Sequence, residues 1–209
     1  MNILDFHTHH AEATDALISV DPRRFAPQAG KWYSVGIHPW DTVETVTEAD
    51  FDLLEQCAIH AQVLAIGETG LDSLRGADIE TQAALFVRHL QLAHDAGKPV
   101  VVHNVRTTQQ ILGTRRQAGL TDVQLAIHGM RGNAHVARTL LDEGCYLSYG
   151  PRFNPEALTA TPLDRLLIET DDSDVTIQDV AARVALVLGF STEVITTTAA
   201  ENARRLLMK

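Results

Sequence analysis

Short apolar runs rich in β-branched residues alternate with longer amphipathic stretches along the chain. Eight runs are typical of buried strands: residues 2–6, 16–20, 32–37, 63–66, 100–102, 123–127, 145–148 and 166–168. Most of the intervals carry apolar residues at helical spacing: about 47–61, 78–97, 107–119, 133–143, 176–188 and 191–207. Strands that alternate with helices predict an α/β fold with a parallel sheet. Eight such strands predict a TIM-type (β/α)8 barrel.

The front of this barrel is predicted to be reduced. Only residues 8–15 separate the first two runs, and 21–31 the next two. Because a parallel crossover with its helix takes about 10–12 residues or more, we expect the first crossover helices to be missing. Helix ends are marked by Gly97-Lys98-Pro99 and by Gly119, and Thr176–Asp179 resembles a capping box. Since no linker or repeat interrupts the pattern, we expect one domain over residues 1–209.

Composition narrows the class of protein. The 209 residues include 17 Lys and Arg against 27 Asp and Glu, a net charge of −10. This balance argues against a broad basic face for nucleic acid, but not against a small phosphate-bearing substrate held by metals. No apolar run approaches the ~18 residues of a membrane span, and no secretory signal is recognisable at the N-terminus. We expect a cytoplasmic protein without a membrane partner, with Cys57 and Cys145 as buried, reduced thiols.

Candidate chemistry gathers at one end of the predicted strands. Seven side chains lie at the C-terminal end of a strand or one or two residues beyond it: His7, His9, His38, Glu68, His103, His128 and Asp171. In a barrel of parallel strands these ends meet at one rim, where the active sites of this fold occur. We therefore expect residues that are far apart in sequence to converge there.

Four imidazoles and two carboxylates of this set predict a metal centre: His7, His9, Glu68, His103, His128 and Asp171. Such ligands, without a thiolate, suit Zn²⁺, Mn²⁺, Ni²⁺ or Mg²⁺. One open zinc site uses about three protein ligands, so six predict two divalent ions, with Glu68 as the candidate bridge. Asp5 shares a strand face with His7 and His9, and we expect it to accept a ring N–H from a ligand histidine.

The remaining histidines are interpreted as structural or surface residues. His60, His89, His94 and His135 fall within predicted helices, and we expect them on the surface or on helix flanks. His10 points to the opposite strand face from His9 if the strand continues, so we do not expect it to be a ligand.

Motifs along nearly the whole chain resemble those of the TatD family of metal-dependent hydrolases. In order they are Asp5–His9 (DFHTH), Gly36–Pro39 (GIHP), Ile66–Asp72 (IGETGLD), Pro99–His103 (PVVVH), Ile127–Gly132 (IHGMRG), Leu167–Asp171 (LIETD) and Ala200–Leu206 (AENARRL). The resemblance implies a barrel that holds two divalent metals and cuts phosphoester bonds, in this family as a deoxyribonuclease.

The same resemblance implies a role for each ligand. His7 and His9 would bind one ion, His103 and His128 would bind the second, and Glu68 would bridge them. Asp171 would meet the first ion and its water. At that position we expect Asp171 to act as general base, with Glu68 as the second catalytic residue.

The sequence departs from the family where a long substrate would bind. The family motif is usually followed by Ser-Pro and a long loop, whereas Asp171 here is followed almost directly by the helix near Thr176. We therefore expect a phosphoester substrate, either DNA or a small phosphodiester. The candidates to bind its phosphate are His38, Arg106, Arg131 and Arg152, because each lies near a predicted strand end.

Two alternatives remain open at this stage. The same barrel rim is compatible with a metal-dependent hydrolase of amide, lactone or aminoacyl-ester bonds, or with a metal-binding protein that lacks catalysis. Amidohydrolase relatives often use a carbamylated lysine as the bridge between metals. No lysine occurs between Lys31 and Lys98, and Glu68 takes that place, which favours the TatD-like reading.

Overall fold

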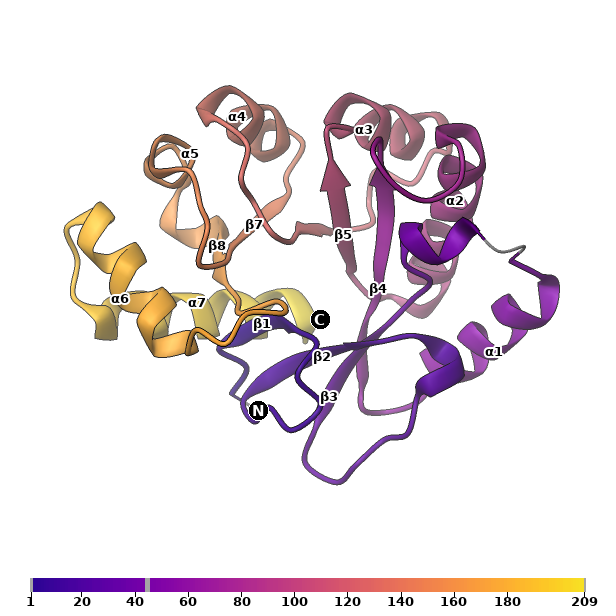
Figure 1. The fold of residues 1–209 in the computed structure, drawn as a ribbon, viewed down its shortest axis with the longest axis horizontal. Helices are drawn as coiled ribbons and strands as arrows, with labels where there is room; N and C mark the ends of the chain where they lie inside the picture. The colour runs from indigo at the N-terminus through magenta and orange to yellow at the C-terminus, as the bar shows by residue number, and fades with distance from the viewer. Residues whose placement is uncertain (1, 44–45, 209) are drawn as a thin grey trace. The chain divides into compact units, whose positions relative to one another are not determined.

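The computed structural model describes residues 2–43 and 46–208. Its strands follow one another in the order β1 to β8, the topology of a closed parallel barrel, with helices in most of the connections (Figure 1). The predicted α/β class and TIM-type (β/α)8 fold are confirmed. The strands are β1 Asp5–Thr8, β2 Ala16–Val20, β3 Trp32–Val35, β4 Val63–Asp72, β5 Val100–Val105, β6 Leu125–Ile127, β7 Tyr146–Tyr149 and β8 Leu166–Ile168.

Seven α-helices belong to these described residues: α1 Glu48–Ala58, α2 Ile79–Ala96, α3 Thr108–Gln117, α4 Ala134–Asp142, α5 Pro155–Thr159, α6 Ile177–Leu188 and α7 Thr192–Leu207. No α-helix lies in residues 9–15, and residues 21–31 hold only a 3₁₀ turn, Pro22–Arg24. The predicted loss of the first crossover helices is therefore confirmed. The helix α5 was not predicted, because five residues are too few to show a helical period.

The chain divides into two compact units. Unit 1 comprises residues 2–18 and 126–208 of the described chain, and unit 2 comprises residues 19–125. In unit 1, β1 pairs in parallel with β2 and β8, and β8 pairs with β7, which pairs with β6. The side chains of Phe6, Leu167 and Ile195 are completely buried in this unit. That residues 1–209 form one domain stays a prediction.

Unit 2 is built around β3, β4 and β5, which pair in parallel in that order. Its helices are α1, α2 and α3. The predicted helix stop after α2 is confirmed, because Gly97 adopts a left-handed φ of 63° and its N–H closes the helix on Ala93 and His94. At the other end of α2, the carboxylate of Asp78 accepts the N–H of Thr81 and caps the helix.

Three strands differ from the sequence prediction in their length or start. β1 begins at Asp5 rather than residue 2, where Ala16 and Ile168 become its neighbours. β4 and β5 run on past residues 66 and 102, with Gly70 opposite His103 and Asp72 opposite Val105. Glu68 and His103 therefore lie inside strands, not beyond their ends. Gly70 permits this because its φ is 138° and a Cβ there would lie 2.2 Å from the His103 carbonyl oxygen.

The prediction that His89 lies on the surface or a helix flank is wrong. Its ring is completely buried in unit 2. The Nε2 atom accepts the backbone N–H of Ile37 at 3.0 Å, and Nδ1–H donates to the carbonyl of Leu85 at 2.8 Å. Burial lowers the pKa of His89 to about 4, so the neutral ring is the native form. A polar residue on a helix gives no signal in the sequence that it accepts a backbone N–H from another element.

We expect His89 to make the fold sensitive to acid. An unfolded histidine titrates near 6.5 and His89 near 4, so its stabilising contribution is complete above pH 6.5 and is lost as the pH falls towards 4. The loss should be about 3 kcal/mol. We expect the free energy of unfolding, measured with urea, to fall less between pH 7 and pH 4.5 in His89→Gln than in the wild type. His94→Gln, on the exposed face of α2, should behave like the wild type; equal losses in all three proteins would contradict this role.

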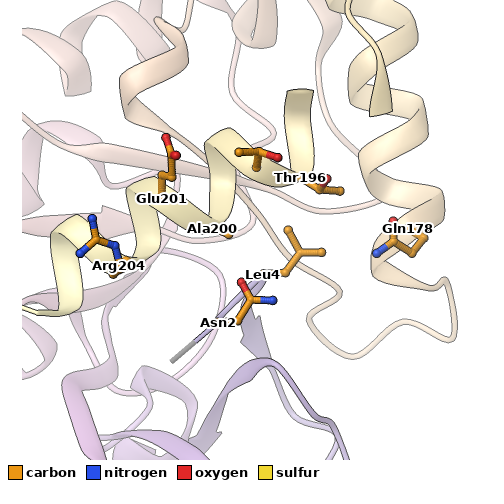
Figure 2. A pocket seen from close by; sticks show the side chains of 8 residues that line it. Asn2, Leu4, Gln178, Thr196, Ala200, Glu201 and Arg204 are labelled. Carbon is orange, nitrogen blue, oxygen red and sulfur yellow. The ribbon is translucent and has the colours of Figure 1, made fainter. Parts of the chain in front are cut away.

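A hollow of about 450 Å³ lies in unit 1 at the N-terminal end of β1 (Figure 2). Asn2 and Leu4 line it on one side, and Glu201 and Arg204 of α7 line it on another. It is at the opposite end of β1 from His9, so it is separate from the predicted rim. Within the described chain, no single helix is long and apolar enough to cross a membrane. The helices α6 and α7 reach that length and composition only as a pair bent by 109°.

Candidate active site

Four of the predicted ligands come together in unit 1: His7, His9, His128 and Asp171. The Oδ1 atom of Asp171 lies 3.8 Å from Nε2 of His7 and 3.7 Å from Nε2 of His9. The rings of His7 and His128 lie 4.2 Å apart, centroid to centroid. One ligand atom each from His7, His128 and Asp171 falls within 4.8 Å of the others. This is the donor set of a borderline or hard divalent ion.

Backbone pairing between β1 and the segment after β8 places Asp171 in this group. Its N–H donates to the carbonyl of His7 at 2.9 Å, and its own carbonyl accepts the N–H of His9 at 3.1 Å. The residue adopts a left-handed φ of 58°, a conformation that Asp and Asn tolerate better than most residues. The chain therefore turns away from the strand at Asp171, and the Asp171 carboxylate lies beside the imidazole rings of His7 and His9.

Two further carboxylates lie behind this group, and one of them corrects a prediction. Asp5 does not accept a ring N–H of a ligand histidine: Oδ1 accepts the N–H of Thr170 at 2.9 Å and Oδ2 accepts its hydroxyl at 2.6 Å. Burial raises the pKa of Asp5 to about 6, against the effect of these hydrogen bonds. The buried Glu169 instead lies near a ligand, with Oε1 3.5 Å from Nδ1 of His128. The same oxygen accepts the N–H of Gly129 at 2.6 Å.

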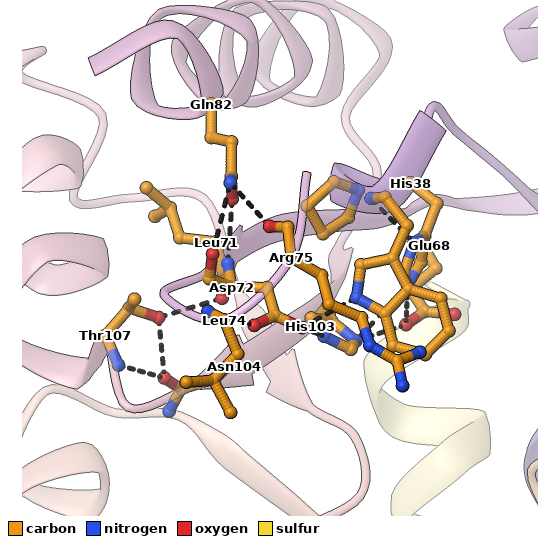
Figure 3. A network of polar contacts seen from close by, with 12 residues as sticks. His38, Glu68, Leu71, Asp72, Leu74, Arg75, Gln82, His103, Asn104 and Thr107 are labelled. Atoms are coloured by element: carbon orange, nitrogen blue, oxygen red, sulfur yellow. Dashed lines mark hydrogen bonds and ion pairs between the residues drawn. The ribbon is translucent and has the colours of Figure 1, made fainter. Parts of the chain in front are cut away.

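The second group lies in unit 2 and centres on Glu68, which is 3% exposed. Its Oε1 atom lies 2.9 Å from Nε2 of His38 and 2.8 Å from Nδ1 of His103 (Figure 3). The backbone N–H of Trp40 donates to Nδ1 of His38 at 3.1 Å. A neutral His38 therefore carries its proton on Nε2 and donates it to Glu68. This tautomer makes His38 a hydrogen-bond donor rather than a metal ligand at Nε2.

The surroundings of His103 fit a divalent cation. Its Nε2 atom lies 3.1 Å from Oδ2 of Asp72, while Nδ1 faces Glu68. A neutral imidazole has one N–H, so only one of the two carboxylates receives a proton from it. If Nε2–H donates to Asp72, the lone pairs of Nδ1 and of Glu68 face each other at 2.8 Å, and a divalent cation held by these two residues would remove that repulsion. The carboxylate–histidine pair would then orient the ligand as in known metal sites.

Asp72 is itself held by several donors. The indole Nε1–H of Trp40 donates to Oδ2 at 2.6 Å, and the N–H of Leu74 donates to Oδ1 at 2.8 Å. Burial alone would raise the pKa of Asp72, but the hydrogen bonds from Trp40, Leu74 and His103 outweigh it and hold the pKa below its usual range. Asp72 therefore stays ionised as the partner of His103.

The predicted phosphate-binding arginines lie after their strands as expected. In unit 1, Arg131 is more than half exposed, and its guanidinium lies 3.9 Å from Oδ2 of Asp171. Arg152 follows β7 and is exposed. In unit 2, Arg106 follows β5 and is also exposed, with a left-handed φ of 59°. Whether any of them contacts substrate stays a prediction.

Sequence reasoning missed three residues that the structure connects to these groups: Asp72, Glu169 and Arg75. The first two stand inside the quoted motifs, as the last residue of IGETGLD and the Glu of LIETD. Their proximity to the motif histidines and glutamate was the available signal. Arg75 gives no such signal, since it is one of many loop arginines until its contact with Trp40 is known.

The chain can be compared with known proteins on this basis. The sequence model of the family described as TatD related DNase matches residues 23–208, which include Glu68, His103, His128 and Asp171. The chain belongs to the TatD family. It is therefore a metal-dependent hydrolase, as its relatives are described.

Two curated relatives share about 30% of their aligned residues with this TatD-family chain. The uncharacterized metal-dependent hydrolase YabD of Bacillus subtilis is 29% identical over 194 residues, which cover 83% of this chain and 76% of the relative. The uncharacterized metal-dependent hydrolase TatD of Mycobacterium tuberculosis is 31% identical over 170 residues, 73% of this chain and 64% of the relative.

Solved structures show the same fold. The TatD homolog YJJV of Escherichia coli K12 superposes with a TM-score of 0.83 at 22% identity, covering 98% of this chain and 97% of that one. A TatD family hydrolase from Entamoeba histolytica superposes with a TM-score of 0.74 at 21% identity, covering 85% and 74%. At these identities the likeness concerns the fold of this TatD-family chain.

Proposed function

We propose that this TatD-family chain hydrolyses phosphoester bonds with two divalent cations. The observation that supports this most is the pair of imidazole–carboxylate groups, one in each unit. His7, His9, His128 and Asp171 would hold an ion in unit 1, and His103 with Glu68 would hold one in unit 2. This assignment differs from the expectation that His128 binds the same ion as His103. That Glu68 bridges the two ions stays a prediction, as does the choice among Zn²⁺, Mn²⁺, Mg²⁺ and Ni²⁺.

The side chains have distinct roles in this proposal. When bound, divalent ions polarise a phosphoester and lower the pKa of a bound water towards about 7. The carboxylate of Asp171 accepts the proton of the attacking water. The Nε2–H of His38 donates to Glu68 in this structure, and His38 would turn it to a substrate oxygen when Glu68 binds a cation. Arg131, exposed beside Asp171, donates to a phosphate oxygen, and Arg106 and Arg152 are further candidates for this contact.

Glu68 supports this reaction over amide hydrolysis with a carbamylated lysine. Unit 2 holds two lysines, Lys31 and Lys98. They precede β3 and β5, at the strand ends opposite His38 and His103. The ammonium of Lys98 donates to the carbonyl oxygens of Ala58 and Val63. Lys98 therefore binds backbone carbonyls away from Glu68. The carboxylate of Glu68 would serve as the metal ligand in place of a carbamylated lysine.

The substrate is proposed to be DNA or a small phosphodiester. Asp171 is followed by a short turn, and α6 begins at Ile177, so little chain is available there to grip a long strand. A small phosphodiester is therefore the better first substrate to assay. A cytoplasmic location is part of the same proposal.

A substrate panel tests this function directly. Chelated protein reloaded with Mn²⁺, Mg²⁺ or Zn²⁺ should hydrolyse bis-p-nitrophenyl phosphate, and chelator should abolish the turnover. The same preparations are assayed on single-stranded DNA and on amide and lactone substrates. Turnover of amides or lactones without phosphodiester turnover would favour the alternative hydrolase, and bound metal with no turnover at all would favour a non-catalytic metal-binding protein.

A further inference from the structure

An arginine stacked on an exposed tryptophan lies beside the second group of ligands. The guanidinium carbon of Arg75 lies 4.3 Å from the centroid of the Trp40 ring, and Trp40 is 43% exposed. The same indole lies 4.8 Å from the ring of His38 and 5.7 Å from the ring of His103, centroid to centroid. The Arg75–Trp40 pair therefore stands next to the side chains proposed to hold an ion in unit 2.

The charge of Arg75 is not neutralised within the described part of the chain. No described carboxylate forms an ion pair with it, and its guanidinium contacts the indole ring. Arg88 is a useful contrast, because it also stacks on an aromatic ring, Phe51 at 3.6 Å, but donates to both oxygens of Glu48 at 2.9 and 2.7 Å. Arg75 thus keeps its N–H donors for an anion from outside the chain.

The segment that carries Arg75 is fixed in place. The buried Gln82 of α2 donates from Nε2 to the carbonyl oxygens of Arg75 at 2.9 Å and Ala77 at 2.6 Å. A Cβ at Gly76 would lie 2.1 Å from the Pro39 carbonyl oxygen, so this loop packs against the residue before Trp40. Trp40 is anchored in turn by its hydrogen bond to Asp72. Both partners of the stack are therefore pre-organised, which lowers the entropic cost of binding a ligand.

We propose that Arg75, held against Trp40, binds the phosphate group of the substrate beside Glu68 and His103. This inference rests on the proposed function and names a binding residue for it. A guanidinium is planar, weakly hydrated on its faces and matched to two phosphate oxygens at its edge. An indole under one face holds that edge in position while leaving the N–H groups available. Trp40 is then a positioning residue, and Arg75 makes the contact.

The fluorescence of Trp40 can report the binding of phosphate. The chain has two tryptophans, and Trp32 lies at the start of β3, the end opposite His38. In a Trp32→Phe background loaded with Mg²⁺, inorganic phosphate should change the emission of Trp40 in a saturable manner. Adding Arg75→Gln should raise the half-saturating concentration about tenfold, and Arg75→Lys should raise it less. Arg88→Gln should leave it unchanged, because Arg88 is paired with Glu48.

Kinetics separate binding from structural damage. With bis-p-nitrophenyl phosphate, Arg75→Gln should raise KM with little change in kcat. Trp40→Phe keeps an aromatic face and should retain most of the affinity, whereas Trp40→Leu should raise KM as Arg75→Gln does. If Arg75→Gln and the Trp32→Phe parent bound phosphate with equal affinity, the inference would be overturned. If phosphate binding depends on Arg75 but no phosphoester is turned over, the proposed function fails while Arg75 remains the anion-binding residue.

Discussion

Replacing Glu68 by Gln should reduce kcat/KM for a phosphodiester by about 10³-fold, the scale of losing a principal electrostatic contact in an active site. The change removes one negative charge and keeps the shape of the side chain. Oε1 of Glu68 lies within 2.9 Å of a ring nitrogen of both His38 and His103. A neutral amide at this position would be a weaker metal ligand and a weaker hydrogen-bond acceptor than the carboxylate. We expect the loss in kcat/KM to be accompanied by lower metal content after dialysis, measured by mass spectrometry.

Glu48→Gln is the matched control for this variant. Glu48 is also in unit 2, but it is exposed at the start of α1 and pairs with Arg88. An exposed ion pair contributes about 0–1 kcal/mol to stability, so Glu48→Gln should keep both its metal and its turnover. If Glu68→Gln retained the turnover and the metal content of the wild type, Glu68 would not be a ligand, and the proposed centre in unit 2 would be wrong.

The fold could be predicted from the sequence because its strongest signals are local. Apolar runs indicated all eight strands, and Gly97 marked the end of α2 as observed. The lengths of β4 and β5 were not predictable in the same way. Glycine weakens a local strand pattern, yet Gly67 and Gly70 both lie inside β4 with positive φ values, where the facing β5 backbone leaves no room for a Cβ. That constraint comes from a neighbouring strand and not from the local pattern.

The candidate site was predictable to the level of which residues gather, but not of which atoms pair. The strand-end rule selected His7, His9 and Asp171 in unit 1, and these lie together. The partner of each ligand depends on the approach of side chains from other elements. Asp5 was expected to accept from a ligand histidine and accepts from Thr170 instead. Such pairings are fixed by packing at the scale of single rotamers, which spacing along the chain does not encode.

Replacing Asp171 by Asn should lower kcat by about 10²- to 10⁴-fold, the range expected for loss of a general base. An amide has the shape of the carboxylate but does not accept a proton from water. The backbone at Asp171 has a φ of 58° and is bonded to His7 and His9. Asn is among the residues that best tolerate this left-handed conformation, so the turn should remain intact. An alanine at this position would confound the loss of the base with backbone strain.

Measurement of metal binding separates the two roles proposed for Asp171. If it acts mainly as base, Asp171→Asn keeps its metal stoichiometry and its KM, and only kcat falls. If it acts mainly as ligand, the variant loses metal on dialysis and regains turnover when more metal is added. Asp174→Asn, three residues further along an exposed turn, removes the same charge away from the imidazoles and should leave both quantities unchanged. Full turnover in Asp171→Asn without added metal would rule out both roles, because no other change in that variant compensates for a missing carboxylate beside His7 and His9.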